Sequence, residues 1–348
     1  MSPPRVLMLL AMAVALSGCA SAAYYLQAVQ GHAELMRRAV PIEEAIASNG
    51  SAPALRARLA RVLAIRSFAS RELALPDNGS YRTYADLGRP FAVWNVFAAP
   101  EFSVRPKESC FLFAGCVSYR GFYDEQQAKR HAEALKGEGY DVFVGGVPAY
   151  STLGWFDDPV LSSFVHYPEP EVARIIFHEL AHQVVYVRDD TSFNESFAVA
   201  VEQQGVQRWL ALEGSEEQRL VWSTLLSRRE QFVDLITRYR ERFEHFYAQP
   251  AGDEQKRAGK KALFEEMRRD YEALKAQWGG FAGYDRFLAQ GPNNALLASV
   301  AAYTEWVPAF RALIEQHRGD MNAFYGEARK LAKLDKRQRN AVLSALAP

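Results

Sequence analysis

One short segment near the middle of the chain constrains the fold and the chemistry most: Ile175-Ile-Phe-His178-Glu179-Leu-Ala-His182-Gln183. Its apolar residues predict a buried helix. Residues four apart on a helix share a face, so His178 and His182 direct two imidazoles at one point. Buried imidazoles need a partner, and this spacing is that of a zinc site in which Glu179 is the general base for the zinc-bound water. The alternative is a helix with two solvated histidines.

A catalytic zinc site also needs a third protein ligand and an open fourth position. Glu195 is the next acidic residue expected on a helix, beyond an intervening turn at residues 185–191. Glu202 competes for the role because it lies seven residues further on, two turns along the same face. Asp189 and Asp190, in the turn, either orient a ligand imidazole through its other nitrogen or simply cap the loop.

These motifs resemble known peptidases. His-Glu-x-x-His-Gln followed by Asn-Glu-x-Phe-Ala at 194–198 is similar to the gluzincin arrangement of zinc aminopeptidases and thermolysin-like peptidases, with a shorter spacer. The chain resembles more closely the predicted aminopeptidases found as bacterial lipoproteins, most distinctively at Ala149-Tyr-Ser-Thr-Leu-Gly-Trp-Phe-Asp-Asp-Pro159. The resemblance spans residues 81–87, 91–101, 110–123, 139–161 and 178–205. It implies that Glu195 is the third ligand, and leaves Glu202 to support the site or to bind a substrate amine.

Other residues are candidates to complete a peptidase site. Zinc peptidases need a donor for the oxyanion of the tetrahedral intermediate, often a Tyr or His. Tyr303, on an apolar helix expected at 295–307, is the first candidate and His166 the second; a core tyrosine is the alternative for Tyr303. Residues 150–154 are expected to supply an edge strand for an extended peptide, or else form a structural turn followed by core aromatic residues, Trp155 and Phe156.

The N-terminus predicts export. Arg5, the apolar run 6–16 and Leu16-Ser-Gly-Cys19 have the layout of a secretory signal, and eleven apolar residues are too few to span a bilayer. The end of this segment resembles a bacterial lipobox, which implies that Cys19 becomes the lipidated first residue of the mature chain. The alternative is a plain signal peptide. Ala20, in place of the Asp that retains lipoproteins in the inner membrane, points to the periplasmic face of the outer membrane.

Two cysteines remain in the mature chain besides Cys19. In an oxidising periplasm Cys110 and Cys116 are free to pair, and such a short loop would staple a local turn. A metal site made from these two cysteines alone is the alternative. We therefore predict a Cys110–Cys116 disulfide.

Composition describes an ordinary folded chain and excludes one class of partner. Hydrophobic residues make up 49% of the 348 residues, and 41 basic residues balance 41 acidic ones. A neutral chain has no global field to attract phosphate backbones, so nucleic-acid binding has no electrostatic support. The expected membrane contact is the lipid anchor alone.

The overall pattern predicts an α+β fold with a zincin-like metallopeptidase core: a small β-sheet, the His-Glu-x-x-His helix and extensive helical extensions at both ends. Strands are expected at 91–97, 110–113 and 140–144, and a helix from Asp124 to Lys136. The expected division of the mature chain, 19–348, is a helical part at 19–86, an α+β catalytic core at 87–205 and a helical part at 206–348.

The predicted function is zinc-dependent hydrolysis of peptides, by an aminopeptidase anchored in the bacterial envelope. Endopeptidase activity is the closest alternative, because the motif indicates hydrolysis and not the position of the bond cleaved. A non-catalytic envelope scaffold that keeps a zinc helix is the other. Glu179 argues against the scaffold, since a structural site does not need a carboxylate beside its first ligand and usually closes its fourth position with Cys or His.

Overall fold

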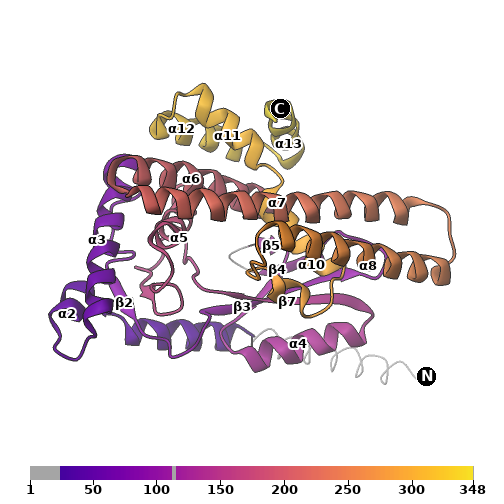
Figure 1. Cartoon of the computed structure of the whole chain (residues 1–348), viewed down its shortest axis with the longest axis horizontal. Coiled ribbons are helices and arrows are strands. Elements are labelled where there is room, and N and C mark those ends of the chain that lie inside the picture. Colours follow the sequence, from indigo (N-terminus) through magenta and orange to yellow (C-terminus); the bar gives the residue numbers. More distant parts are fainter. Residues whose placement is uncertain (1–23, 112–114, 348) are drawn as a thin grey trace, which may run out of the picture.

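The computed structural model describes residues 24–111 and 115–347 and shows a mixed α+β fold in which helices predominate (Figure 1). The α+β class predicted from the sequence is confirmed. The expected signal segment and Cys19 lie outside the described residues. None of the described helices is both long enough and apolar enough to cross a membrane.

The N-terminal part combines helices with two short strands. A helix at residues 24–38 precedes the short α2 (Ile42–Ala47) and the long α3 (Pro53–Leu73). A small sheet lies beside them in the order β1 (Val40–Pro41), β2 (Thr83–Ala85) and β8 (Val160–Leu161). Strand β2 pairs antiparallel with β1 and parallel with β8, which brings the segment before β8 close to the segment before β2.

The main sheet is antiparallel, in the order β6 (Arg120–Phe122), β3 (Val93–Pro100) and β7 (Tyr140–Val147). Strand β3 is buried over all but its last residue because helices cover both faces of the sheet. Helix α4 (Glu125–Gly137) packs on one face. Its N-cap is Asp124, which accepts a hydrogen bond from Gln127 N, so the predicted start of this helix is confirmed.

A hairpin of β4 (Ser109–Phe111) and β5 (Gly115–Val117) stands apart from the main sheet. Cys110 and Cys116 face each other across it and form a disulfide, with the two sulfurs 2.01 Å apart. The pairing of these two cysteines therefore agrees with the sequence prediction.

The rest of the chain is helical. The elements are α5 (Glu169–Ala181), α6 (Thr191–Glu213), α7 (Glu216–Ala248), α8 (Asp253–Gln277), α9 (Asp285–Leu288), α10 (Asn294–Thr304), α11 (Val307–Gln316), α12 (Met321–Ala332) and α13 (Lys336–Leu346). Helices α7, α8 and α10 cover the second face of the main sheet, while α3, α5, α6 and α11–α13 enclose the largest hydrophobic core (Figure 1).

Residues 150–154 do not form the expected edge strand; they lie in the loop between β7 and β8. Leu153 and Gly154 have left-handed backbones, with φ of 58° and 82°, which is incompatible with an extended strand. The expectation of core aromatic residues after them is also wrong, because Trp155 is 77% and Phe156 53% exposed.

Candidate metal centre

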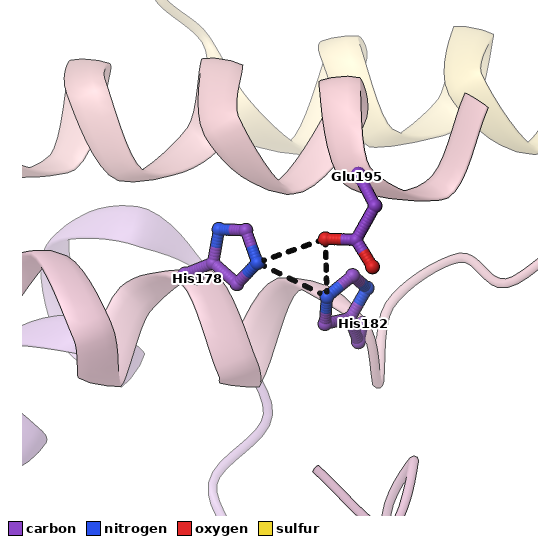
Figure 2. Close-up of side chains that lie close together, drawn as sticks. All are labelled: His178, His182 and Glu195. Atoms are coloured by element: carbon purple, nitrogen blue, oxygen red, sulfur yellow. Dashed lines mark hydrogen bonds and ion pairs between the residues drawn. The ribbon is translucent and has the colours of Figure 1, made fainter. Parts of the chain in front are cut away.

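Two helices packed face to face, α5 and α6, carry the site. His178 is near the C-terminal end of α5, His182 is the C-cap of that helix, and Glu195 lies in the first turns of α6. The three side chains point into the space between the helices (Figure 2). Helices α5 and α6 are both buried over most of their length, so core packing fixes the positions of the site residues.

The polar atoms of these three residues converge closely. The Nε2 atoms of His178 and His182 are 3.2 Å apart, and Glu195 Oε2 lies 3.3 Å from the first and 3.6 Å from the second. The side chains are almost completely buried, at 9%, 8% and 7% exposure. Such a group could hold a metal ion. Two imidazoles and one carboxylate are also the protein ligand set of several catalytic zinc sites, so the residues fit the expected metal.

The charge state of the group supports this fit. Burial disfavours the charged form of His178, but its contacts with Glu195 and Glu202 raise its pKa to about 10. Burial likewise opposes ionisation of Glu195, yet His182 and His178 hold the pKa of that carboxylate at about 2. The site therefore attracts a positive charge strongly, and a metal ion would supply it in place of a proton.

Glu202 lies behind the converging group and is 2% exposed. Its Oε2 is 2.9 Å from His178 Nδ1 and accepts a hydrogen bond of 3.0 Å from Arg174. Arg229 approaches its Oε1 at 3.7 Å, and both arginines also bind Glu171. With His178 Nδ1 donating to Glu202, His178 Nε2 presents its lone pair to the site. Glu202 is thus placed to orient a ligand imidazole, and its oxygens are not free for a substrate amine.

The short spacer between the helices is held by its own hydrogen bonds. The Asn194 side chain accepts a hydrogen bond from Val187 N and donates one to Val187 O, at 2.7 and 2.8 Å. Asp190 caps α6 and pairs with the buried Arg339, while Asp189 accepts from Cys116 N. Neither aspartate contacts an imidazole, and His182 Nδ1 has no partner among the described residues. The loop-capping alternative for the two aspartates is therefore the one observed.

Glu179 projects from α5 beside the two histidines and is half-buried. Burial raises its pKa, against the opposing effect of His178 and His182. A carboxylate with a raised pKa and no hydrogen-bond partner among the described residues has the properties of a general base.

Tyr303 lies on α10, which packs against α6, and Trp306 N donates to Ser196 Oγ at 3.0 Å, beside Glu195. Burial and then the Glu195 carboxylate raise the pKa of Tyr303 well above its ordinary value. Sequence reasoning missed Tyr119, whose pKa is raised by the same two causes. It directly precedes β6, and no local motif distinguishes it from the other tyrosines.

His166 is wrong as an alternative donor. It is exposed and precedes the first residue of α5, Glu169. His178 lies nine residues after Glu169, a rise of about 14 Å along the helix, so His166 belongs to the opposite end of α5.

Taken together, the fold and the site define a candidate metal centre of the His-Glu-x-x-His class on a helical α+β scaffold. The sequence model of the family described as "Putative aminopeptidase" matches residues 23–343, and the chain belongs to this family. No curated protein and no solved structure matches the chain significantly. Family membership supports peptidase activity and a peptide substrate.

Proposed function

We propose that this protein is a zinc-dependent aminopeptidase with a zincin-like core. The observation that carries the proposal is the convergence of His178 Nε2, His182 Nε2 and Glu195 Oε2, beside a Glu179 carboxylate that has no hydrogen-bond partner in the described part of the chain. Three ligands leave a fourth position open, as catalysis requires, and the family match supplies the substrate class.

The proposed mechanism assigns one role to each residue. A bound zinc ion would supply Lewis acidity toward the scissile carbonyl and toward the attacking water. Glu179 takes the proton of that water and returns it to the leaving amine. Tyr303 donates a hydrogen bond to the oxyanion of the tetrahedral intermediate, with Tyr119 as the alternative donor. Glu202 keeps His178 in the tautomer that can bind the metal.

Cellular location is a separate part of the proposal. The expected lipobox places the acyl anchor at Cys19, only a few residues before the first described helix. We infer that the enzyme is held by this anchor at the periplasmic face of the outer membrane, that the lipid is its only membrane contact and that nucleic acid is not among its partners.

Substitution of Glu179 by Gln tests catalysis against scaffolding. The change keeps the shape and all three ligands but removes the base, so turnover should fall about 10²–10⁴-fold while metal analysis still finds one zinc per chain. Tyr303→Phe should also retain zinc, with turnover reduced about 10²–10³-fold. As a matched control, His178→Ala combined with His182→Ala should lose the metal as well as the activity.

The substrates distinguish the remaining alternatives. Short peptides with a free amino terminus should be cleaved by the wild type, and N-blocked, internally quenched peptides should not. Equal cleavage of both kinds would make the protein an endopeptidase. Full zinc occupancy without cleavage of a broad peptide library would establish the scaffold instead.

A further inference from the structure

A loop before β2 is fastened to α5 close to Glu179. Gln183 lies four residues after Glu179, directly beyond His182, the C-cap of α5. The Gln183 side chain accepts a hydrogen bond from Asn78 at 2.7 Å and donates one to Ser80 at 3.1 Å. The segment 78–80 is therefore tied to the turn that follows α5, four residues beyond the proposed general base.

A buried arginine, Arg66, also holds the loop before β2 in place. Arg66 is fully buried and donates hydrogen bonds to the carbonyl oxygens of Pro76, Asn78 and Ser80 at 2.7, 3.1 and 2.7 Å. Tyr81, the next residue, has a left-handed backbone with φ of 63°. A tyrosine holds this conformation only where its surroundings impose it.

Tyr81 is joined in turn to Asp158, the residue that ends the loop before β8. Tyr81 N donates a hydrogen bond of 2.6 Å to Asp158 O. The Asp158 carboxylate is held on one side only, where its Oδ2 accepts from Thr152 N at 2.8 Å and from Thr152 Oγ1 at 3.1 Å. Both side chains therefore have fixed positions.

Two polar atoms of this arrangement are left without partners among the described residues. Asp158 Oδ1 and Tyr81 Oη are both buried, make no hydrogen bond there, and belong to residues that are 1% exposed. A buried unpaired oxygen is costly, and each such case calls for an explanation. Burial raises the pKa of both groups, and the Glu179 carboxylate raises each further.

Against the effect of burial, His178 and His182 lower the pKa of Glu179 and Arg66 lowers that of Tyr81, but no ion pair to Asp158 forms in the described part of the chain. Neither lysine nor arginine bonds there to Asp158 or Glu179, in contrast to Glu202, which has two arginines. The donors of Arg66 are used by Ser70 and by the oxygens of segment 76–80. Asp158 Oδ1 and Tyr81 Oη are thus two buried oxygens that receive no hydrogen bond from a positively charged donor in the described part of the chain.

We infer that Asp158 and Tyr81 bind the α-ammonium group of a peptide substrate. This assignment rests on the proposed peptidase function and deepens it, because it gives the exopeptidase preference a structural cause. An ammonium group has three donors, which suit Asp158 Oδ1, Tyr81 Oη and an oxygen of Glu179. Glu179 is the only one of the three that is partly exposed, so the amine approaches past the general base and places the first carbonyl next to it.

Calorimetric binding of a non-cleavable peptide tests the site without relying on turnover. The probe is a tripeptide whose first peptide nitrogen is replaced by methylene, used with a free amino terminus and as its N-acetyl form, on zinc-loaded protein. The wild type should bind the free-amine form about 10- to 100-fold more tightly, the usual value of a charge-assisted hydrogen-bonded contact. Asp158→Asn should reduce this preference to nearly onefold, and Tyr81→Phe should reduce it severalfold.

The neighbouring Asp157 is a matched control because it is exposed, and Asp157→Asn should keep the full preference. Tyr81→Phe removes only a hydroxyl, so it still tests the site if Asp158→Asn fails to fold. Equal wild-type affinity for the two probes would overturn the ammonium site and leave the peptidase intact. A preference that survives in both variants would overturn it too, assigning Asp158 a purely structural role. Failure of the wild type to bind either probe would overturn the proposed function together with this site.

Discussion

The two sides of α5 differ in whether their buried polar groups are paired. On the Glu202 side, contacts of 2.9–3.0 Å join two carboxylates, two guanidinium groups and one imidazole: Glu171, Arg174, His178, Glu202 and Arg229. Arg229 Nη1 makes no hydrogen bond among the described residues but lies 3.7 Å from Glu202 Oε1, so its charge is paired. On the Glu179 side, Asp158 Oδ1 and Tyr81 Oη have no partner within residues 24–111 and 115–347. A buried network of paired charges fixes the positions of its side chains, whereas buried oxygens without partners can accept hydrogen bonds from a ligand.

The pKa values express the same difference. Burial alone would raise the pKa of Glu202, but Arg174, His178 and Arg229 hold it at about 2. Burial raises the pKa of Asp158 to about 7, since Thr152 offers only neutral hydrogen bonds and Glu179 adds repulsion. The Glu202 carboxylate is therefore always ionised, whereas the Asp158 carboxylate ionises fully only when a cation binds beside it.

Removal of one cation from the Glu202 side should have the largest effect on stability. Arg174→Met leaves Glu171 and Glu202 buried with a single remaining arginine, and an uncompensated buried charge costs about 3–5 kcal/mol. Denaturant unfolding of the variant should show a loss of this size. Arg38→Met is the control, because Arg38 and Glu34 form an exposed pair that contributes less than about 1 kcal/mol. Equal losses in the two variants would mean that the buried network has no special role.

The sequence predicted the parts of the site that are local along the chain. His178, Glu179 and His182 follow from helical spacing, and Glu195 and Glu202 both reach the site because seven residues make two turns. Asp124 as a helix N-cap and the strands around Val96 and Phe143 are equally local signals, and the structure contains them.

What the sequence did not predict depends on distant contacts. Arg229 reaches Glu202 from α7, and Asp158 meets Tyr81 across 77 positions of sequence. Residues 150–154 looked strand-like, but the Thr152–Asp158 hydrogen bonds close them into a loop. No periodicity encodes such pairings, because they are set by which loops the core brings together.

The free energy of unfolding should depend on pH through Asp158, on the Glu179 side of α5. The pKa of Asp158 is raised from an ordinary 3.8 to about 7, so between these values the folded protein holds a proton that the unfolded chain has released. Raising the pH through this window therefore lowers the free energy of unfolding, by at most about 4 kcal/mol at roughly 1.4 kcal/mol per pKa unit. Unfolding measured at pH 4 to 8 should show this decline in the wild type and lose it in Asp158→Asn. The exposed Asp157→Asn should keep the wild-type slope, and a slope shared by all three proteins would contradict the assignment.

The smallest expected effect concerns zinc affinity and its dependence on Glu202. Glu202→Gln keeps an oxygen near His178 Nδ1 but removes the negative charge that makes the imidazole a stronger ligand, and such changes typically weaken metal affinity about 10- to 100-fold. Zinc affinity, measured by competition with a chelator of known strength, should fall by this factor while Glu195 and both histidines remain. Glu213→Gln, at the exposed end of the same helix, is the control and should bind zinc as the wild type does. An undiminished affinity in Glu202→Gln would mean that the network stabilises the packing of α5 on α6 and leaves the ligand imidazole unaffected. If Glu202→Gln loses both zinc affinity and folding stability, Arg174→Met separates the two roles of the network. That variant perturbs the same packing of α5 on α6 without contacting His178.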